Sequence, residues 1–204
     1  MQDVPVPPVS EDDVPNNNLL KMIDAGDDVF ELVQSDALIL RQTAENFDFA
    51  NPPFDPIVLA TKLANTMIKK GAYGIAAPQV GLPFNVFVIG NPGDKEATCM
   101  AFFNTTIVDS SKEEEYYEEG CLSYPNLFLK VKRPSSIRLR FTNMHNDTNT
   151  SKFTGLTARI IQHEYDHIRG VVFKDRASLH HLQQAKTKRK KLNRQNKRAQ
   201  KESK

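Results

Sequence analysis

The clearest periodic pattern of apolar and polar positions covers residues 55–70, DPIVLATKLANTMIKK. Its apolar residues recur at intervals of three and four, which places them on one face of a helix. They are Ile57, Ala60, Leu63, Ala64, Met67 and Ile68. Asp55 before Pro56 is a common helix start, with a capping side chain followed by a proline in the first turn. We therefore predict a helix over 55–70 that ends at Gly71 and Gly74.

The same spacing predicts a second long helix over 155–168. Its apolar residues stand among polar ones, and they are Leu156, Ile160, Ile161 and Ile168. Gly170 follows where glycine often ends a helix. A shorter amphipathic helix is expected in NLLKMIDAGDDVFELVQ, residues 18–34. The pattern thus predicts three helices, of which the one over 155–168 carries HEYDH at 163–167.

Alternation of apolar and polar residues predicts three strands between the two long helices. They cover FNVFVIGN at 84–91, CMAFFNTTIV at 99–108 and SSIRLRFTN at 135–143. Strands dispersed among two main helices are typical of an α+β protein rather than a parallel doubly wound sheet. We predict small antiparallel sheets packed around a central helix that carries HEYDH.

The length of 204 residues fits one domain with extensions, and the charge pattern indicates where the extensions lie. Residues 1–50 contain eleven acidic and two basic side chains, a sum of −9, although the whole chain carries only +2. Residues 186–204 contain ten basic side chains and one acidic side chain, a sum of +9. We predict an acidic, partly disordered extension over 1–29, a central domain over 30–180, and a basic tail over 181–204 that is disordered or a solvated helix.

Composition also bounds the compartment. Cys99 and Cys121 are too few for a disulfide framework, so a reducing cytoplasm is expected. No apolar run is long enough to span a bilayer, and we predict no membrane contact. The acidic, proline-rich start matches neither a secretory signal nor a transit peptide. We expect a monomer, because no dimerisation surface is legible.

The stretch IIQHEYDHIRG, residues 160–170, predicts a metal site. On a helix, His163 and His167 lie one turn apart on one face, where both imidazoles can bind one ion. Glu164 lies beside them and can hold and deprotonate a water. The alternative is a polar helix face with two hydrogen-bonded histidines.

A site with two histidines needs a third protein ligand, for which the sequence offers several residues. Downstream, Asp175, His180 and His181 lie at spacings that match neither pattern of the common zinc proteases. Upstream, Cys121 in EEGCLSYP offers a thiolate, a strong ligand for a borderline divalent ion. On its own, Cys121 would more often be a small buried apolar residue.

Three ordered motifs carry a resemblance to a known family. YGIAAPQVG at 73–81, EGCLS at 119–123 and QHEYDH at 162–167 resemble the signature motifs of peptide deformylase. The resemblance covers roughly residues 30–178. It departs at the first motif, where Ala72 stands for the usual glycine and Ile75 for a common leucine. It implies a metal-dependent hydrolase that removes the N-formyl group from the initiator methionine of nascent polypeptides in a bacterial-type cytosol.

The resemblance also implies roles for individual residues. The metal ligands are Cys121, His163 and His167, for one divalent ion that is natively Fe(II), with Zn, Ni or Co as substitutes. The catalytic groups are the Glu164 general base and two donors to the carbonyl oxygen, the Gln79 amide and the Leu122 backbone N–H. The substrate-binding residues are Gly74, Ile75, Glu119 and Gly120. Three protein ligands leave a fourth position open for water, as in catalytic sites.

Several neighbours of these residues have a supporting role or an open one. Glu119, Gln162 and Asp166 are interpreted as groups that orient the ligands. Asp166 could instead pair in solvent with Arg169 or Arg133. Ile75, together with Leu156 and Ile160, either lines an apolar pocket for the methionine side chain or belongs to the core.

The basic tail 183–204 suggests a partner, because runs of lysine and arginine bind phosphates without sequence preference. For an enzyme of nascent chains, the expected partner is the ribosome or its RNA. Two other classes remain open. A zinc endopeptidase would share HEYDH but cleave internal peptide bonds, and a non-enzymatic RNA-binding protein would need only the tail.

Overall fold

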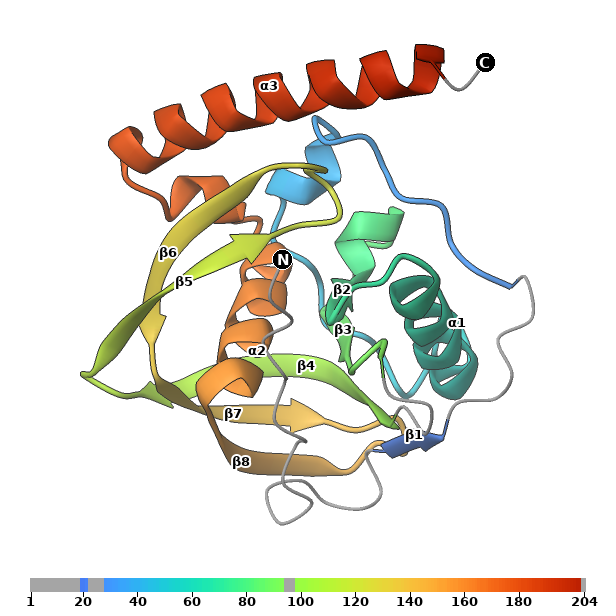
Figure 1. Ribbon diagram of the computed structural model, residues 1–204. Coiled ribbons are helices and arrows are strands. Elements are labelled where there is room, and N and C mark those ends of the chain that lie inside the picture. The colour runs from blue at the N-terminus through green and yellow to red at the C-terminus, as the bar shows by residue number, and fades with distance from the viewer. Residues whose placement is uncertain (1–18, 22–27, 94–97, 203–204) are drawn as a thin grey trace.

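The computed structural model describes residues 19–21, 28–93 and 98–202. Its helices are α1 (Pro56–Lys69), α2 (Gly155–Ile168) and α3 (Leu179–Glu202), with short 3-10 turns η3 (Leu38–Arg41), η4 (Ala77–Val80) and η5 (Phe173–Asp175). Its strands are β1 (Leu19–Lys21), β2 (Gly74–Ala76), β3 (Val86–Ile89), β4 (Thr98–Ser110), β5 (Glu114–Gly120), β6 (Phe128–Pro134), β7 (Ser136–Thr142) and β8 (Thr148–Thr154). Figure 1 shows these elements along the chain.

All strand pairs of the described residues are antiparallel and form two sheets. The larger sheet has the order β2-β3-β4-β7-β8, and β1 pairs with the beginning of β4. The smaller sheet is the β5–β6 hairpin, in which Gly120 lies opposite Phe128. Because β6 leads into β7 through a single residue, the hairpin stays attached to the large sheet and arches over α2 (Figure 1).

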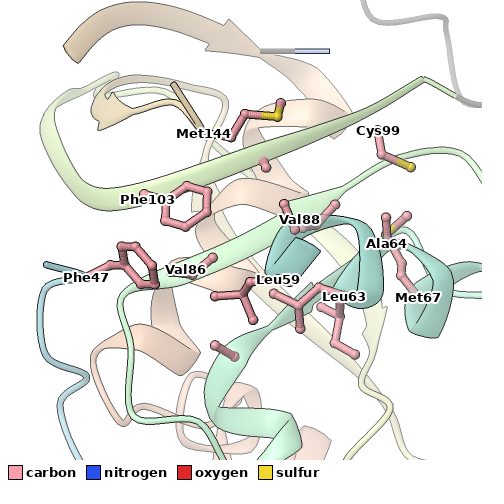
Figure 2. Packing of buried hydrophobic residues seen from close by; sticks show 14 residues of the cluster. Phe47, Leu59, Leu63, Ala64, Met67, Val86, Val88, Cys99, Phe103 and Met144 are labelled. Atoms are coloured by element: carbon pink, nitrogen blue, oxygen red, sulfur yellow. The ribbon is translucent and has the colours of Figure 1, made fainter. Parts of the chain in front are cut away.

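The large sheet has a hydrophobic core on each face. Along β3, Val86 and Val88 belong to the core under α1, while Phe87 and Ile89 belong to the core under α2. Side chains that alternate between the faces of a strand produce this division. Figure 2 shows the first core, where Leu63 and other residues of α1 pack on the sheet.

The start of α1 follows the sequence pattern. Asp55 is the N-cap, and its carboxylate accepts hydrogen bonds from the backbone N–H groups of Ile57 and Val58 at 2.9 Å. Pro56 occupies the first turn, where its missing N–H costs no hydrogen bond. The helix predicted over 55–70 is thus confirmed, and Gly71 follows it with φ +66°.

Helix α2 is the central element, as the sequence predicted. One side of α2 packs Ala158, Ile161 and Ile168 into the core of the large sheet. Its other side presents buried polar residues to the hairpin, and there the Gln162 side chain donates to the Pro134 carbonyl at 3.0 Å. The predicted fold class, α+β with small antiparallel sheets around the helix that carries HEYDH, is confirmed.

A third apolar cluster joins the hairpin to the C-terminal part of the chain. Leu182 and Ala185 of α3 pack against buried residues that include Leu129 and Val131 of β6. Asn126 donates to Asn193 at 3.0 Å and adds a polar contact further along the helix. Residues 179–202 therefore form a helix that is attached near its start and lies along one side of the molecule (Figure 1).

Two parts of the chain differ from the predicted elements. The helix expected over 18–34 is wrong, because residues 19–21 form strand β1 and 28–34 have no helical structure; 22–27 lie outside the described residues. The predicted acidic extension 1–29 lies almost entirely outside them as well. The β5–β6 hairpin was missed in the sequence.

Among the helices described, none combines the length and apolarity needed to cross a membrane.

Candidate metal centre

Three side chains converge between the end of β5 and the middle of α2. Cys121 directly follows β5, and His163 and His167 lie one turn apart on α2. The ligand atoms of the three residues lie within 4.8 Å of one another. The Cys121 Sγ is 3.3 Å from the His167 Nε2. The structure thus brings together the cysteine and the histidines that the sequence predicted as metal ligands.

Glu119 fixes the orientation of one imidazole. Its Oε2 lies 3.0 Å from the Nδ1 of His163, so a proton on Nδ1 leaves the Nε2 lone pair free to bind a metal. Arg133 holds the same carboxylate from the side, with Nε 2.7 Å from Oε1 and Nη2 2.9 Å from Oε2. Arg159 adds a third contact at 2.8 Å. Both carboxylate oxygens are therefore bound to protein partners.

The ion pairs continue beyond Glu119. The Nη1 of Arg133 donates to the Oδ2 of Asp166 at 2.7 Å, and Arg176 reaches the same carboxylate from the surface at 2.5 and 3.1 Å. Of the two partners considered for Asp166, Arg133 is correct. The pair is not solvated, because the side chains of both residues are 4% exposed.

Burial alone would raise the pKa of Glu119, but the hydrogen bonds from His163 and Arg133 outweigh it and hold this pKa well below its usual range. Glu119 therefore stays ionised beneath the ligands. A buried carboxylate with several charge-assisted hydrogen bonds is a rigid support for a metal ligand.

Glu164 follows His163 directly on α2. Its side chain is buried, and its Oε2 is among the few buried polar atoms of the described residues that have no hydrogen-bond partner in the protein. Burial raises the pKa of Glu164 to about 7 against the lowering by His163 and His167. The carboxylate is thus poised to exchange a proton near neutral pH.

Gly74 provides the space for that carboxylate. A Cβ at Gly74 would lie 2.8 Å from the Glu164 Cδ and 2.9 Å from its Cγ, and the Oε1 would be closer still. A side chain at position 74 would therefore displace the Glu164 carboxylate from this position. The neighbouring Ala72 needs no such freedom, because its φ is not positive.

We expect Gly74→Ala to lower turnover about 100-fold, since the added methyl displaces the carboxylate by roughly 1 Å. The metal content should stay at the wild-type level, because the three ligands are untouched. Formate release and bound metal are the two measurements. Gly93→Ala is the matched control: a Cβ there meets only the Asn91 Oδ1 at 3.5 Å. Wild-type turnover by Gly74→Ala would contradict this role.

Gln79 is oriented toward the metal site by a backbone contact. Its Oε1 accepts a hydrogen bond from the Ala76 N–H at 2.9 Å, so its amide nitrogen must point the other way. That nitrogen lies 3.2 Å from the Ser123 hydroxyl and 3.6 Å from the Cys121 Sγ. The donor that the sequence predicted is thus held at the thiolate.

The site fits a divalent metal. One soft sulfur and two imidazole nitrogens are a donor set for iron, nickel, cobalt or zinc. Burial alone would raise the pKa of the Cys121 thiol, but His167 and His163 outweigh it and lower that pKa well below its ordinary value. The Glu164 Oε2 is buried and has no protein partner. A bound cation would neutralise the Cys121 thiolate and could bring a partner for this oxygen.

Two of the predicted substrate-binding residues are buried. Ile75 is fully buried in the core under α1. The Glu119 carboxylate is bound to His163 and two arginines.

The remaining ligand alternatives do not reach the site. Asp175 forms an ion pair with Arg41, and His180 and His181 lie on the first turn of α3. Sequence reasoning missed Arg159, whose signal was an arginine on the inward stripe of α2, one turn before His163. It also missed Arg176, for which the local sequence holds no signal.

Comparisons with known proteins agree with this geometry. The family model described as Polypeptide deformylase matches residues 29–183. Peptide deformylase from Cytophaga hutchinsonii is 35% identical over 154 residues, which cover 74% of this chain and 83% of the relative. The crystal structure of plant peptide deformylase PDF1B has a TM-score of 0.73 at 27% identity. The aligned region covers 83% of this chain and 92% of the plant chain.

A further solved structure is a class I type b peptide deformylase from Acinetobacter baumannii with Met-Ala-Ser bound. Its TM-score is 0.66 at 28% identity, and the aligned region covers 72% of this chain and 98% of the A. baumannii chain. The family match spans most of the chain and includes all three motifs. This chain therefore belongs to the peptide deformylase family, the metal-dependent hydrolases that remove the formyl group from nascent polypeptides.

Proposed function

We propose that Glu164, Gln79 and the Leu122 backbone carry out the deformylation in this chain. The observation that supports this most is the placement of the Glu164 carboxylate, which is buried over Gly74 and has one oxygen without a protein partner. The Gln79 amide nitrogen is held 3.6 Å from the Cys121 Sγ. A formamide group bound between them would have a base on one side and a donor on the other.

A divalent ion held by the Cys121 sulfur and the Nε2 atoms of His163 and His167 would act as a Lewis acid and lower the pKa of a bound water. We propose Fe(II) as the native ion, with nickel, cobalt or zinc able to replace it. Because Cys121 and Fe(II) are both open to oxidation, we propose a reducing cytosol as the compartment.

Each protein group has one task in this proposal. Glu164 accepts the proton of the water that attacks the formyl carbon, and returns it to the amine that leaves. Gln79 Nε2 and the Leu122 N–H donate to the carbonyl oxygen as negative charge develops on it. Gly74 leaves room for the Glu164 carboxylate, and Gly120 lies against the Phe128 ring. The Glu119 carboxylate supports His163 from below.

Formate release from formyl-Met-Ala-Ser tests this function directly, and the tripeptide matches the one named for the A. baumannii structure. We expect release by the metal-loaded protein, loss of release after chelation, and recovery on adding metal without oxygen. Casein is the control substrate. Its digestion together with no formate release would indicate an endopeptidase instead.

We further propose that residues 30–180 are the catalytic unit of a cytosolic monomer and that the basic tail over 183–204 binds ribosomal RNA. Exposed basic side chains cluster on α3: Lys186, Lys188, Lys190, Lys191 and Arg194. Lys186, Lys190 and Arg194 recur every four residues along one face of α3. Such a surface attracts phosphates in a salt-dependent way. Leu182 and Ala185 attach α3 to the hairpin, whereas the five basic side chains named above stay exposed.

We expect the triple change Lys188→Gln, Lys190→Gln and Lys191→Gln to weaken ribosome co-sedimentation and to lower its salt slope by about one unit per lysine that contacts phosphate. Turnover of the short peptide should stay unchanged. The matched control removes three exposed lysines elsewhere, Lys70, Lys130 and Lys152. Equal binding by both triple variants would rule out the tail as the contact.

A further inference from the structure

A continuous series of ion pairs runs from the molecular surface to a metal ligand. It begins at Arg176, whose side chain is 48% exposed and grips the buried Asp166 carboxylate with two nitrogens. Asp166 binds Arg133, Arg133 binds Glu119, and Glu119 binds His163. Every contact in this series is 3.1 Å or shorter. We refer to these residues, from Arg176 to Glu119, as the arginine–carboxylate chain.

We propose that Arg176 is a positioning residue of the metal centre, which acts on His163 through the arginine–carboxylate chain. The proposal rests on the metal site described above. It extends the set of groups that hold the ligands to a side chain in the segment between η5 and α3. Arg176 is the residue of interest because it supplies the outermost contact in the series.

The geometry of Arg133 explains why the outer contact matters. Its guanidinium is planar, so the contact of Nη1 with Asp166 and the contacts of Nε and Nη2 with Glu119 fix one common orientation. Arg176 binds both oxygens of Asp166 and leaves that carboxylate a single position. Without Arg176, one oxygen of Asp166 loses its cation, and Asp166 and Glu119 share Arg133 with more freedom.

The attachment of the C-terminal segment offers a built-in comparison. Arg41 forms an ion pair with Asp175, the residue next to Arg176, and so tethers the same segment to η3. That pair is about as exposed as Arg176, at 45% and 41% for the two side chains, but it makes no contact with Asp166 that the structure records. If Arg176 only tethered the segment, the loss of Arg41 should have the same effect on the metal.

The experiment compares Arg176→Met with Arg41→Met in the full-length holoprotein. Metal release to an excess of chelator is followed without substrate, and the cobalt(II)-loaded proteins are compared by their absorption spectra. For Arg176→Met we expect about 10-fold faster metal release and a shifted cobalt spectrum. Loss of a group that orients a metal ligand typically weakens metal binding by about 10- to 100-fold, and this value is at the low end of that range. Arg41→Met should keep the wild-type release rate and spectrum.

Arg176→Lys separates charge from geometry. Lysine restores the positive charge but not the two-nitrogen grip, so we expect release between the rates of wild type and Arg176→Met. Thermal unfolding of each variant reports whether it folds. Wild-type release and an unchanged cobalt spectrum in Arg176→Met would overturn the proposal, and so would equal effects of Arg176→Met and Arg41→Met. Because neither readout needs deformylation, this test is independent of the formate assay.

Discussion

Replacing Glu164 by glutamine is expected to lower the kcat of formate release by about 10²- to 10⁴-fold, the usual contribution of a general base. The amide keeps the size of the carboxylate over Gly74 but cannot accept the proton. The ligand atoms of Cys121, His163 and His167 are unchanged, so the variant should bind a full complement of metal. Kinetics on formyl-Met-Ala-Ser and the metal content are measured on the same preparation.

The control for Glu164→Gln is Glu118→Gln. Glu118 is an exposed carboxylate on β5, two residues before Gly120, and makes no contribution to the donor set. It should retain wild-type kinetics. If Glu164→Gln kept more than about a tenth of the wild-type kcat with full metal, Glu164 would not be the base.

Arg133→Met is expected to lower the free energy of unfolding by about 3–5 kcal/mol, the range for breaking a buried ion pair on one side. The side chains of Arg133, Glu119 and Asp166 are all less than 7% exposed, so neither carboxylate can turn to water without local rearrangement. The measurement is urea unfolding monitored by circular dichroism. The control is Lys132, the residue before Arg133, which forms a half-exposed ion pair with Glu114. Lys132→Met should change the free energy of unfolding little.

The effect of Arg133→Met should depend on pH with a defined sign. Because the pKa of Glu119 is lowered in the folded protein, its ionised form stabilises the fold above the ordinary carboxyl pKa, about 4.3. This stabilisation is lost as the pH falls below that value. Removal of Arg133 raises the pKa of Glu119, so the difference between variant and wild type should be largest at neutral pH and shrink in acid. A difference that grows in acid would contradict this account.

Features that depend on local sequence were predicted well. The helices over 55–70 and 155–168 follow from apolar spacing, and their ends lie within about one residue of α1 and α2. Cys121 was identified as a metal ligand only through the family motifs. Its local sequence does not indicate a contact with two histidines about forty residues later in the chain. Its position beside His167 is a tertiary contact that periodicity does not encode.

Features that depend on contacts distant in sequence were missed. The β5 sequence EEYYEEG is too polar to show alternation, since its register with β6 turns Glu119 inward to buried arginines rather than to an apolar core. The helix expected over 18–34 failed because a short helix is marginal in water, whereas Leu19–Lys21 gains backbone hydrogen bonds from β4. An ion pair such as Arg176–Asp166 produces no periodic pattern in the sequence, so pattern analysis does not predict it.

The pairing of β1 with β4 has a consequence for shortened forms of the protein. Beyond Phe103, β4 is covered by β7, but at Thr98–Met100 the same edge is covered only by Leu19–Lys21 among the described residues. A chain that begins after Lys21 would leave the N–H and C=O groups of this edge bare, next to the apolar Met100 and Cys99. Bare strand edges pair with other molecules and lead to aggregation. We therefore expect a chain shortened in this way to associate with itself more readily than the full chain.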